Sequence, residues 1–442
     1  MGVSAPRGAA EPFDRLDTLS PAGLRRWWTQ RVRRVLDIAA AELPFYQRRF
    51  AAAGFEPSGF HRLEDLGRLP TFRKRDVLEA QERLCSHAIG IERLPAGTGA
   101  SAITLSSGTI GTTFITISQR WRRLQARSSA RGHWWAGFRA GSPFVISAPA
   151  WHNYAAIQPA LAEFFHSPCV VVAGTYLPRY ADRIVDAFRR FRPRFITMFL
   201  PMVFPILSAA RRQGVEPKQL FDQVEALLVT GAPITAGMRD HLRDLTGVGR
   251  ISEVAGTSES VLAMECREQR GLHVVPDTCY VEVVDRESGR PVAPGERGSV
   301  VHCFLIPEGS IYLRYDSEDA ATIDVTPCAC GLPSPRLKMV GRWEHSFQLA
   351  GRTLLPYDVQ LAIEHGVPEM IGMPFVIVRE GLAKGQLRLL LPEPPSGATA
   401  LRDGVTAVLE REFSVPAAIG WVRELPLQFK GVAPVLSETQ VG

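Results

Sequence analysis

Residues 106–113 combine side chains that are suited to holding a phosphate group. The segment reads Ser-Ser-Gly-Thr-Ile-Gly-Thr-Thr and directly follows a short apolar run that ends at Leu105. Glycines let the backbone turn tightly and bring amide groups close to an anion, and the hydroxyl groups add further donors. The segment lacks the Gly-Lys-Ser/Thr ending of a Walker loop. Taken alone, it fits a phosphate cradle and an ordinary serine-rich turn equally well.

Four further segments follow this loop in a fixed order. They read Gly-Ala-Pro-Ile-Thr, Gly-Thr-Ser-Glu, Tyr-Leu-Arg-Tyr-Asp-Ser-Glu-Asp and Gly-Arg-Trp-Glu-His, at residues 231–235, 256–259, 312–319 and 341–345, the last leading into 351–356. Together with the loop they resemble the motifs of the adenylate-forming superfamily, and within it the phenylacetate-coenzyme A ligase branch. The resemblance runs from about Leu43 to near the C-terminus. It implies that ATP converts a carboxylic acid to an acyl-adenylate with release of pyrophosphate.

The resemblance also assigns roles to individual residues. It places the ATP phosphates on Ser106, Ser107, Gly108, Thr109 and Gly111, and it lines the nucleotide and acyl pocket with Gly231, Ala232, Pro233, Ala255, Gly256 and Thr257. Glu259 would hold Mg²⁺, since a hard cation bridging phosphates takes carboxylate oxygen. Asp319 would accept from the ribose hydroxyls, and Arg342 would offer a charged fork to ribose or phosphate. The alternatives are a solvated loop acid for Glu259 and a surface ion pair for Asp319 with Arg342.

Lysines are scarce, which narrows the search for a catalytic cation. Only five of the 51 basic residues are lysines. Lys430, followed by Gly431, stands where the superfamily keeps its adenylation lysine, on a mobile C-terminal domain. An ammonium there would stabilise charge that develops between carboxylate and α-phosphate. The sequence departs from the family pattern at the usual loop lysine, the second loop threonine, the adenine-stacking aromatic and the hinge acids, where it has Thr112, Ile110, Ala255 and Glu344-His345.

Three cysteines and one histidine predict a closed metal site. Cys266 and His273 are followed about 55 residues later by Cys328 and Cys330. Three sulfurs and one imidazole complete the tetrahedral shell of a structural Zn²⁺. The spacing is not that of a common zinc finger, so reduced thiols beside a surface histidine are the alternative. Similar positions occur in members of the ligase branch that carry a metal.

Aromatic side chains between the loop and residue 231 could form the wall of an acid pocket. We expect substrate contacts from Trp151, His152 and Tyr154, because they follow a break after a strand-like run. Flat apolar walls suit an aryl ring, so the acid is predicted to be aromatic. The alternative for each of these side chains is a place in the hydrophobic core.

Composition bounds the class of protein. A chain of 442 residues with 45% hydrophobic composition can build more than one core. The net charge of +6 comes from scattered arginines without a nucleic-acid motif, so no nucleic-acid partner is expected. No apolar run reaches the length of a signal peptide or a membrane span, and seven cysteines are an odd number. We therefore expect a cytoplasmic protein without a membrane partner, and a homodimer would suit the family.

The pattern of apolar runs predicts the elements that position these residues. Helical spacing from Ser20 to about Leu84 predicts a helical lead-in, residues 1–100. Short apolar runs alternating with amphipathic stretches predict an α/β adenylate-forming core of parallel strands over 101–342, with a β hairpin between 280 and 301. Residues 343–442 are expected to form a small, mobile α+β domain.

The sequence leaves the acyl acceptor open. The resemblance favours coenzyme A as the thiol that displaces AMP. An amine, a hydroxyl or a carrier-protein thiol is the alternative acceptor. A nucleotide-binding relic without activity is the third reading, favoured by Thr112 and Ala255 and opposed by the retained Glu259, Asp319 and Lys430.

Overall fold

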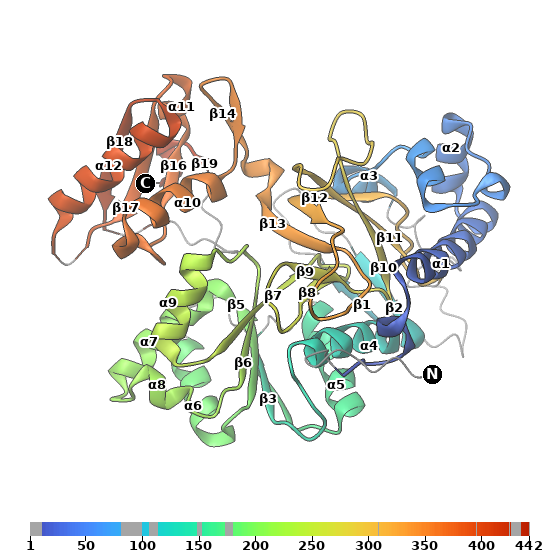
Figure 1. The fold of residues 1–442 in the computed structure, drawn as a ribbon, viewed down its shortest axis with the longest axis horizontal. Coiled ribbons are helices and arrows are strands. Elements are labelled where there is room, and N and C mark those ends of the chain that lie inside the picture. Colours follow the sequence, from blue (N-terminus) through green and yellow to red (C-terminus); the bar gives the residue numbers. More distant parts are fainter. Residues whose placement is uncertain are drawn as a thin grey trace.

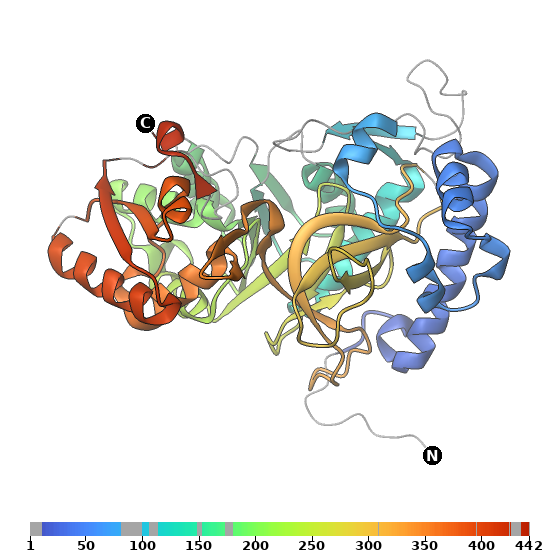
Figure 2. The same cartoon turned by 90° about the horizontal axis from the view of Figure 1, so that it is seen from above.

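The structure is a computed structural model that describes residues 11–80, 100–105, 114–147, 153–172, 180–307, 309–394, 396–423, 425 and 435–441. Its core is an eleven-stranded mixed sheet, with an N-terminal helical segment packed at one end and a small separate C-terminal unit at the other (Figures 1 and 2). Among these residues we find no helix with the length and apolar character needed to cross a bilayer.

The N-terminal segment is helical and packs on the antiparallel half of the sheet. Its elements are η1 (Arg15–Thr18), α1 (Pro21–Glu42), α2 (Pro44–Ala53), η2 (Pro57–Gly59), η3 (Leu63–Arg68) and α3 (Lys74–Ala80). Ser20 caps α1 by accepting from the Gly23 amide, and Pro21 occupies the first turn, where its missing N–H costs nothing. The buried face of α1 packs on β10, where the Trp28 ring lies 5.5 Å from that of Tyr280.

The first half of the sheet is parallel and covered on both faces. Strands β4, β3, β5, β6 and β7 lie side by side in that order, with bounds Cys169–Val172, Phe144–Ser147, Phe195–Phe199, Ala226–Thr230 and Arg250–Gly256. Along β5 the side chains alternate: Ile196 and Met198 pack in one cluster, and Phe195 and Phe199 pack in another. The covering helices are α4 (Gln119–Trp135), α5 (Asn153–Phe165), α6 (Ala181–Phe191), α7 (Val203–Arg212), α8 (Pro217–Leu220) and α9 (Ala236–Thr246).

The second half of the same sheet is antiparallel. It continues from β7 through β8 (Val261–Glu265), β9 (Leu272–Val274), β13 (Arg336–Arg342), β12 (Tyr315–Asp324), β11 (Gly298–Phe304) and β10 (Cys279–Val284). The hairpin predicted between 280 and 301 is confirmed, since β10 and β11 pair antiparallel. A separate two-stranded ribbon joins β1 (Ala100–Leu105) and β2 (Phe114–Ser118). The predicted α/β fold class is confirmed by this architecture.

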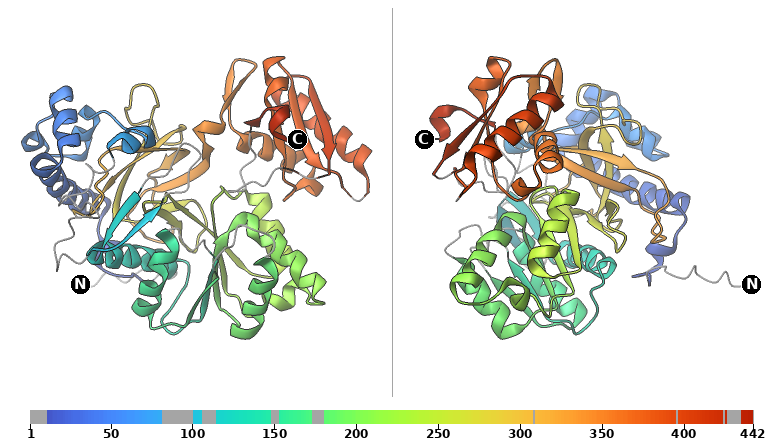
Figure 3. Two further views of the ribbon diagram at one scale, coloured as in Figure 1. Left: turned by 180° about the vertical axis from the view of Figure 1, so that it is seen from behind. Right: turned by 60° about the vertical axis from the view of Figure 1, so that its left-hand side comes forward.

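The C-terminal unit, residues 347–441, has its own four-stranded sheet and core. Strand order is β18-β17-β16-β19, and α10 and α12 pack against each other. The unit contains β14 (Phe347–Leu349), β15 (Arg352–Leu354), α10 (Pro356–Gly366), β16 (Val376–Val378), α11 (Arg379–Ala383), β17 (Leu387–Pro392), α12 (Ala398–Phe413), β18 (Ala417–Val422), β19 (Val435–Leu436) and α13 (Glu438–Val441). It joins the large body through β13 and the short turn η8 (Trp343–His345), and the left-hand view of Figure 3 shows it to one side of the sheet.

Candidate active site

A cluster of charged side chains gathers where β12 and β13 meet. Asp319 and Arg342 are opposite each other in the register of these strands, and Arg342 Nε lies 3.5 Å from Asp319 Oδ1. Arg342 Nη1 also lies 3.3 Å from Glu344 Oε1 in the turn that follows. Burial opposes the charge of Arg342, but Asp319 and Glu344 raise its pKa above the usual value. The pair is about three-quarters buried, which is more than a surface ion pair requires.

Glu259 reaches the same cluster from the turn between β7 and β8. Its side chain is 4% exposed, so it is not a solvated loop acid. The turn is tight: Thr257 N–H donates to Ser260 O at 2.9 Å, and a Cβ on Gly256 would lie 2.7 Å from that same oxygen. Glycine is therefore required at 256, where the chain leaves β7 and enters the turn that carries Glu259.

Tyr315 connects the two sides of the cluster. Burial raises the pKa of its phenol well above the ordinary value, and the nearby charges of Glu259 and Asp319 raise it further, while Arg342 opposes them. The phenol therefore stays protonated and can donate a hydrogen bond. Glu259, Asp319 and Arg342, which the sequence places on three separate segments, are thus brought together around one tyrosine.

Lys74 is a member of this cluster that sequence reasoning missed. The segment before α3 is bound to β12, because the Asp316 amide donates to Phe72 O at 2.7 Å and the Phe72 amide donates to Arg314 O at 3.2 Å. This places the half-buried Lys74 within the field of Glu259. Burial lowers the pKa of Lys74, Glu259 raises it, and Arg342 lowers it. The scarcity of lysine in the sequence could have drawn attention to Lys74, because each of the five lysines is a candidate for a role that needs an ammonium group.

The turn after β6 forms a second wall. Gly231 has φ +91°, and a Cβ there would lie 2.6 Å from the Phe199 ring, so a side chain would be both strained and overlapping. Ala232 is buried beside it, and Thr235 ends the turn by capping α9. Turns at the carboxyl ends of parallel strands are where open α/β sheets bind ligands.

Ala255 faces away from this wall. It pairs with Ala263 of β8 and packs in the apolar cluster that includes Leu262 and Tyr312. The position where the family resemblance leads us to expect a stacking aromatic therefore contributes one methyl group to the core.

The four residues predicted as metal ligands converge behind the sheet. The ligand atoms of Cys266, His273, Cys328 and Cys330 all lie within 4.8 Å of one another. Cys266 Sγ is 4.0 Å from Cys328 Sγ, and Cys330 Sγ is 3.3 Å from His273 Nε2. A tetrahedral ion with Zn–S bonds of about 2.3 Å separates two sulfurs by roughly 3.8 Å. The pairing of Arg336 with His273 between β13 and β9 brings these distant segments together.

The protonation of this cluster also suits a metal. His273 Nδ1 lies 2.9 Å from Ser334 O; a carbonyl can only accept, so Nδ1 carries a proton, and Nε2 is the nitrogen that faces the thiols, 3.3 Å from Cys330 Sγ. A hydrogen bond from the Cys330 thiol, together with the neighbouring His273, lowers the pKa of Cys266, which favours the thiolate that a metal ion requires. Cys266, His273 and Cys330 are buried and Cys328 is half-buried. The residues present therefore fit a closed structural Zn²⁺ site.

Comparison with known proteins finds a family match for the central part of the chain. The profile of the AMP-binding enzyme family matches residues 102–302, which span β1 to β11 and include Glu259. Phenylacetate-coenzyme A ligase of Thermus thermophilus is 28% identical over 392 residues, covering 86% of this chain and 84% of the relative. Residues 102–302 therefore match the AMP-binding enzyme family, and the relatives that align with most of the chain are phenylacetate-coenzyme A ligases. Phenylacetate-coenzyme A ligase of Escherichia coli is 27% identical, covering 70% of this chain and 69% of the relative.

Solved structures show the same adenylate-forming fold. A 2-hydroxyisobutyryl-CoA ligase in its postadenylation state superposes with a TM-score of 0.83 at 21% identity, covering 99% of this chain and 96% of that one. The same ligase in its thioesterification state superposes with a TM-score of 0.68 at 23% identity, covering 95% and 92%. The two-domain arrangement described here is therefore closer to the first of these structures.

Several of the predicted site residues of this chain lie outside the described residues. They are the loop residues Ser106, Ser107, Gly108, Thr109 and Gly111, the pocket residues Trp151 and His152, and Lys430. Tyr154 is described only through the backbone of α5. The strands on either side of the loop pair antiparallel, with Leu105 opposite Phe114, so the loop joins the two ends of a hairpin.

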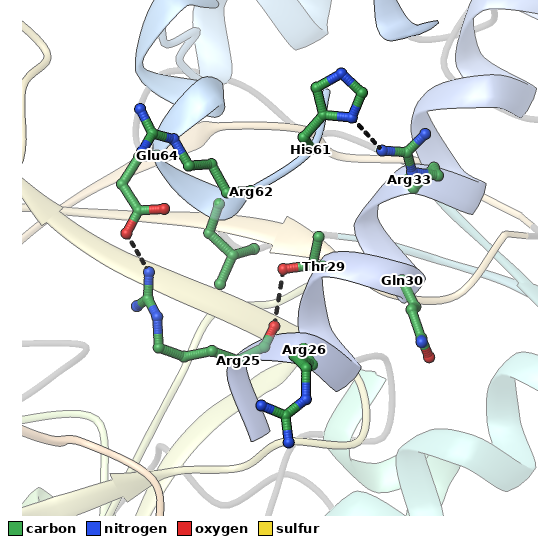
Figure 4. Close-up of a pocket in the computed structure, with 9 residues that line it drawn as sticks. Arg25, Arg26, Thr29, Gln30, Arg33, His61, Arg62 and Glu64 are labelled. Carbon is green, nitrogen blue, oxygen red and sulfur yellow. Dashed lines mark hydrogen bonds and ion pairs between the residues drawn. The ribbon is translucent and has the colours of Figure 1, made fainter. Parts of the chain in front are cut away.

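A concave surface away from the candidate site lies on the N-terminal helices. It is a groove of about 480 Å³ lined mainly by basic side chains of α1 and the segment 61–64 (Figure 4). Two of its arginines already have protein partners: Arg25 pairs with Glu64, and Arg33 donates to Phe60 O. None of the candidate nucleotide-site residues lines this groove.

Proposed function

We propose that this chain is an AMP-forming acid-thiol ligase that activates an aromatic carboxylic acid with ATP and transfers the acyl group to coenzyme A. The observation that carries the proposal is the convergence of Glu259, Asp319, Arg342 and Lys74 at one place on an AMP-binding fold. The aromatic class is supported by the phenylacetate-coenzyme A ligases among its relatives.

Each charged residue has a task in such a reaction. Glu259 would hold Mg²⁺, and its burial beside Lys74 keeps the carboxylate at a fixed position. When bound, Mg²⁺ neutralises the charge that grows on the departing pyrophosphate. Asp319 would accept from the ribose hydroxyls, while Arg342 holds Asp319 in place and directs its remaining N–H groups to the nucleotide.

The loop 106–113 and Lys430 would complete the site. Loop hydroxyls and amides would surround the phosphates, with Gly231, Ala232 and Pro233 along the adenine and acyl pocket. We also propose residues 343–442 as a mobile domain that turns about Trp343 to His345 between adenylation and thioester formation. Cys266, His273, Cys328 and Cys330 would hold a Zn²⁺ that stabilises the fold, since four protein ligands leave no open position for chemistry.

A panel of acids tests the function. Acid-dependent exchange of pyrophosphate into ATP should be seen with one or more aryl acids and should be weaker with short aliphatic acids. If none of the acids in the panel supports exchange, ligase activity is contradicted and a nucleotide-binding relic is favoured. Adding coenzyme A should then give a thioester detectable by mass. Adenylate without thioester would contradict coenzyme A as acceptor and direct the search to amines, hydroxyls and carrier proteins.

Replacing Lys74 with methionine is expected to raise the KM for ATP about tenfold, because a charge-assisted contact to phosphate is lost where the loop already lacks its usual lysine. The check is exchange at varied ATP concentration, with the exposed Lys218→Met as a matched control. Equal KM values for both variants would show that Lys74 serves Glu259 and not the nucleotide.

Replacing Lys430 with alanine is expected to reduce adenylation about 10²- to 10³-fold, the usual cost of removing a group that stabilises transition-state charge. Thioester formation from acyl-adenylate supplied in advance should change by less than threefold. Lys384→Ala, in the turn after α11, is the control. Adenylation that survives in Lys430→Ala would refute its assignment.

A further inference from the structure

The N-terminus of α9 contacts α10 of the C-terminal unit through one hydrogen-bonded chain. Thr235 Oγ1 accepts from the Met238 amide at 3.0 Å, capping α9, and donates to Glu364 Oε2. The other carboxylate oxygen of Glu364 accepts from Gln360 Nε2 at 2.7 Å. Both Thr235 and Glu364 are buried. The Thr235 hydroxyl therefore makes one hydrogen bond within the large body and one to the C-terminal unit.

The two surfaces fit closely around this contact. A Cβ on Gly237 would lie 3.0 Å from Glu364 Oε2 and 3.2 Å from Ile371 Cδ1. Gly372 has φ +84°, and a Cβ there would lie 3.0 Å from the Phe204 ring of α7. Glycine on each side thus allows α10 and the segment after it to approach α7 and α9 without a gap.

A second contact holds the other end of α10. Arg297, before β11, forms a two-pronged ion pair with Asp358, with Nη1 at 2.8 Å from Oδ2. Asp358 also caps α10 by accepting from the Leu355 amide at 2.9 Å. The helix is therefore fixed at its first turn by Arg297 and at its last turn by Thr235. The Arg297 contact is partly exposed and contributes less than a buried one.

The buried carboxylate makes the Thr235 contact specific to one arrangement. Removing a carboxylate from water is costly unless hydrogen bonds replace those to water, and here a hydroxyl, an amide and the positive N-terminal end of α9 do so. Figure 1 shows α10 on the side of the C-terminal unit that faces α9, so a rotation about η8 would change the separation of these two helices. The same rotation would return Glu364 to water and leave Thr235 with only its capping bond.

Thr235 also belongs to the candidate site. It ends the turn that begins at Gly231, four residues earlier, so a shift of this turn moves the hydroxyl that Glu364 accepts from. The acyl group and adenine would lie against this turn. The position of the C-terminal unit and the occupancy of the pocket are therefore linked through one side chain.

We infer that Thr235 and Glu364 are positioning residues that hold the C-terminal unit in the adenylation arrangement and release it for thioester formation. The inference rests on the proposed function. It adds a named contact to the general domain rotation, and it predicts that removing the contact slows adenylation without slowing thioester formation.

Half-reaction kinetics of the full-length ligase test the inference. In Thr235→Val and Glu364→Met, pyrophosphate exchange should fall about tenfold, the range expected for a lost hydrogen bond to a carboxylate. Conversion of supplied acyl-adenylate and coenzyme A to thioester should stay equal or become faster. Thr235→Ser keeps the hydroxyl and should recover most of the exchange, and the exposed Glu369→Gln should resemble wild type. A parallel fall in both half-reactions, or no fall in either, would overturn the inference.

Hydrogen exchange of the ligand-free protein gives a readout that does not depend on activity. Glu364→Met should accelerate amide exchange in residues 356–366 at least fivefold and leave β5 and β6 unchanged. Unchanged exchange in α10 would overturn the contact's role. If no acid is turned over by the wild type, the proposed function fails, and hydrogen exchange alone then decides whether Thr235 and Glu364 hold the unit in place.

Discussion

Replacing Glu259 with glutamine should reduce acid-dependent adenylation by about 10²- to 10³-fold at saturating substrates. Glutamine keeps the shape of the side chain but removes the charge that a hard cation requires, and the cation stabilises the pyrophosphate charge in the transition state. Because the effect appears in the transition state, kcat should fall more than the KM for ATP rises. The measurement is pyrophosphate exchange as a function of ATP and Mg²⁺.

The burial of Glu259 makes this prediction more specific, and an exposed glutamate elsewhere in the chain serves as its control. Because the Glu259 side chain is only 4% exposed, another acidic side chain has little room to take over its role. Glu287 is an exposed glutamate in the β10–β11 turn, so Glu287→Gln should retain full activity. Higher Mg²⁺ concentration should restore part of the exchange in Glu259→Gln. Exchange within threefold of wild type at ordinary Mg²⁺ would remove Glu259 from the reaction.

Glu259→Gln should leave the fold largely intact if the turn geometry is as described. The conformation of the turn depends on Gly256 and on the bond from Thr257 to Ser260 O, not on the carboxylate. Thermal unfolding of the variant should therefore occur within a few degrees of wild type. A large loss of stability would indicate that the carboxylate instead neutralises Lys74 and Arg342 in the folded state.

Local patterns in the sequence were sufficient for the fold class and for part of the site. Short continuous apolar runs that alternate with amphipathic stretches predicted the parallel half, because strands buried on both faces of a sheet have apolar side chains at every position. Glu259, Asp319 and Arg342 were singled out because the short motifs that contain them resemble those of the adenylate-forming superfamily. The structure places all three around Tyr315.

Contacts between distant segments could not be predicted in the same way. Lys74 meets Glu259 only because Phe72 pairs with Tyr315, and nothing in the local sequence of either segment specifies that bridge. Thr235 and Glu364 are 129 residues apart, and each alone has the sequence of an ordinary helix position. The Cys/His cluster is an exception to this rule. Cysteines are rare and have few other uses, so Cys266 and Cys330 could be predicted to lie together although they are far apart in the sequence.

Removing one ligand of the Cys/His cluster is expected to cause the largest loss of stability in this chain. Fresh protein should contain one zinc per chain by elemental analysis, and Cys330→Ser should lose it. The melting temperature should fall by about 10 °C or more, because structural zinc contributes many kcal/mol and each kcal/mol shifts the melting temperature of a body this size by a few degrees. Differential scanning fluorimetry with and without a chelator measures the effect.

The control for this loss is Cys169→Ser, since Cys169 is half-buried on β4 and outside the cluster. It should keep the zinc and melt within a few degrees of wild type. Protein without metal, or a Cys330→Ser variant that melts like Cys169→Ser, would contradict a structural zinc site. At 25 °C the folded fraction of Cys330→Ser should still adenylate, because four protein ligands leave the ion no position for substrate. The cluster lies on the segments that carry β8, β9 and β13. Loss of the metal should therefore affect Arg342 by making these strands less rigid, and not by changing the chemistry of the site.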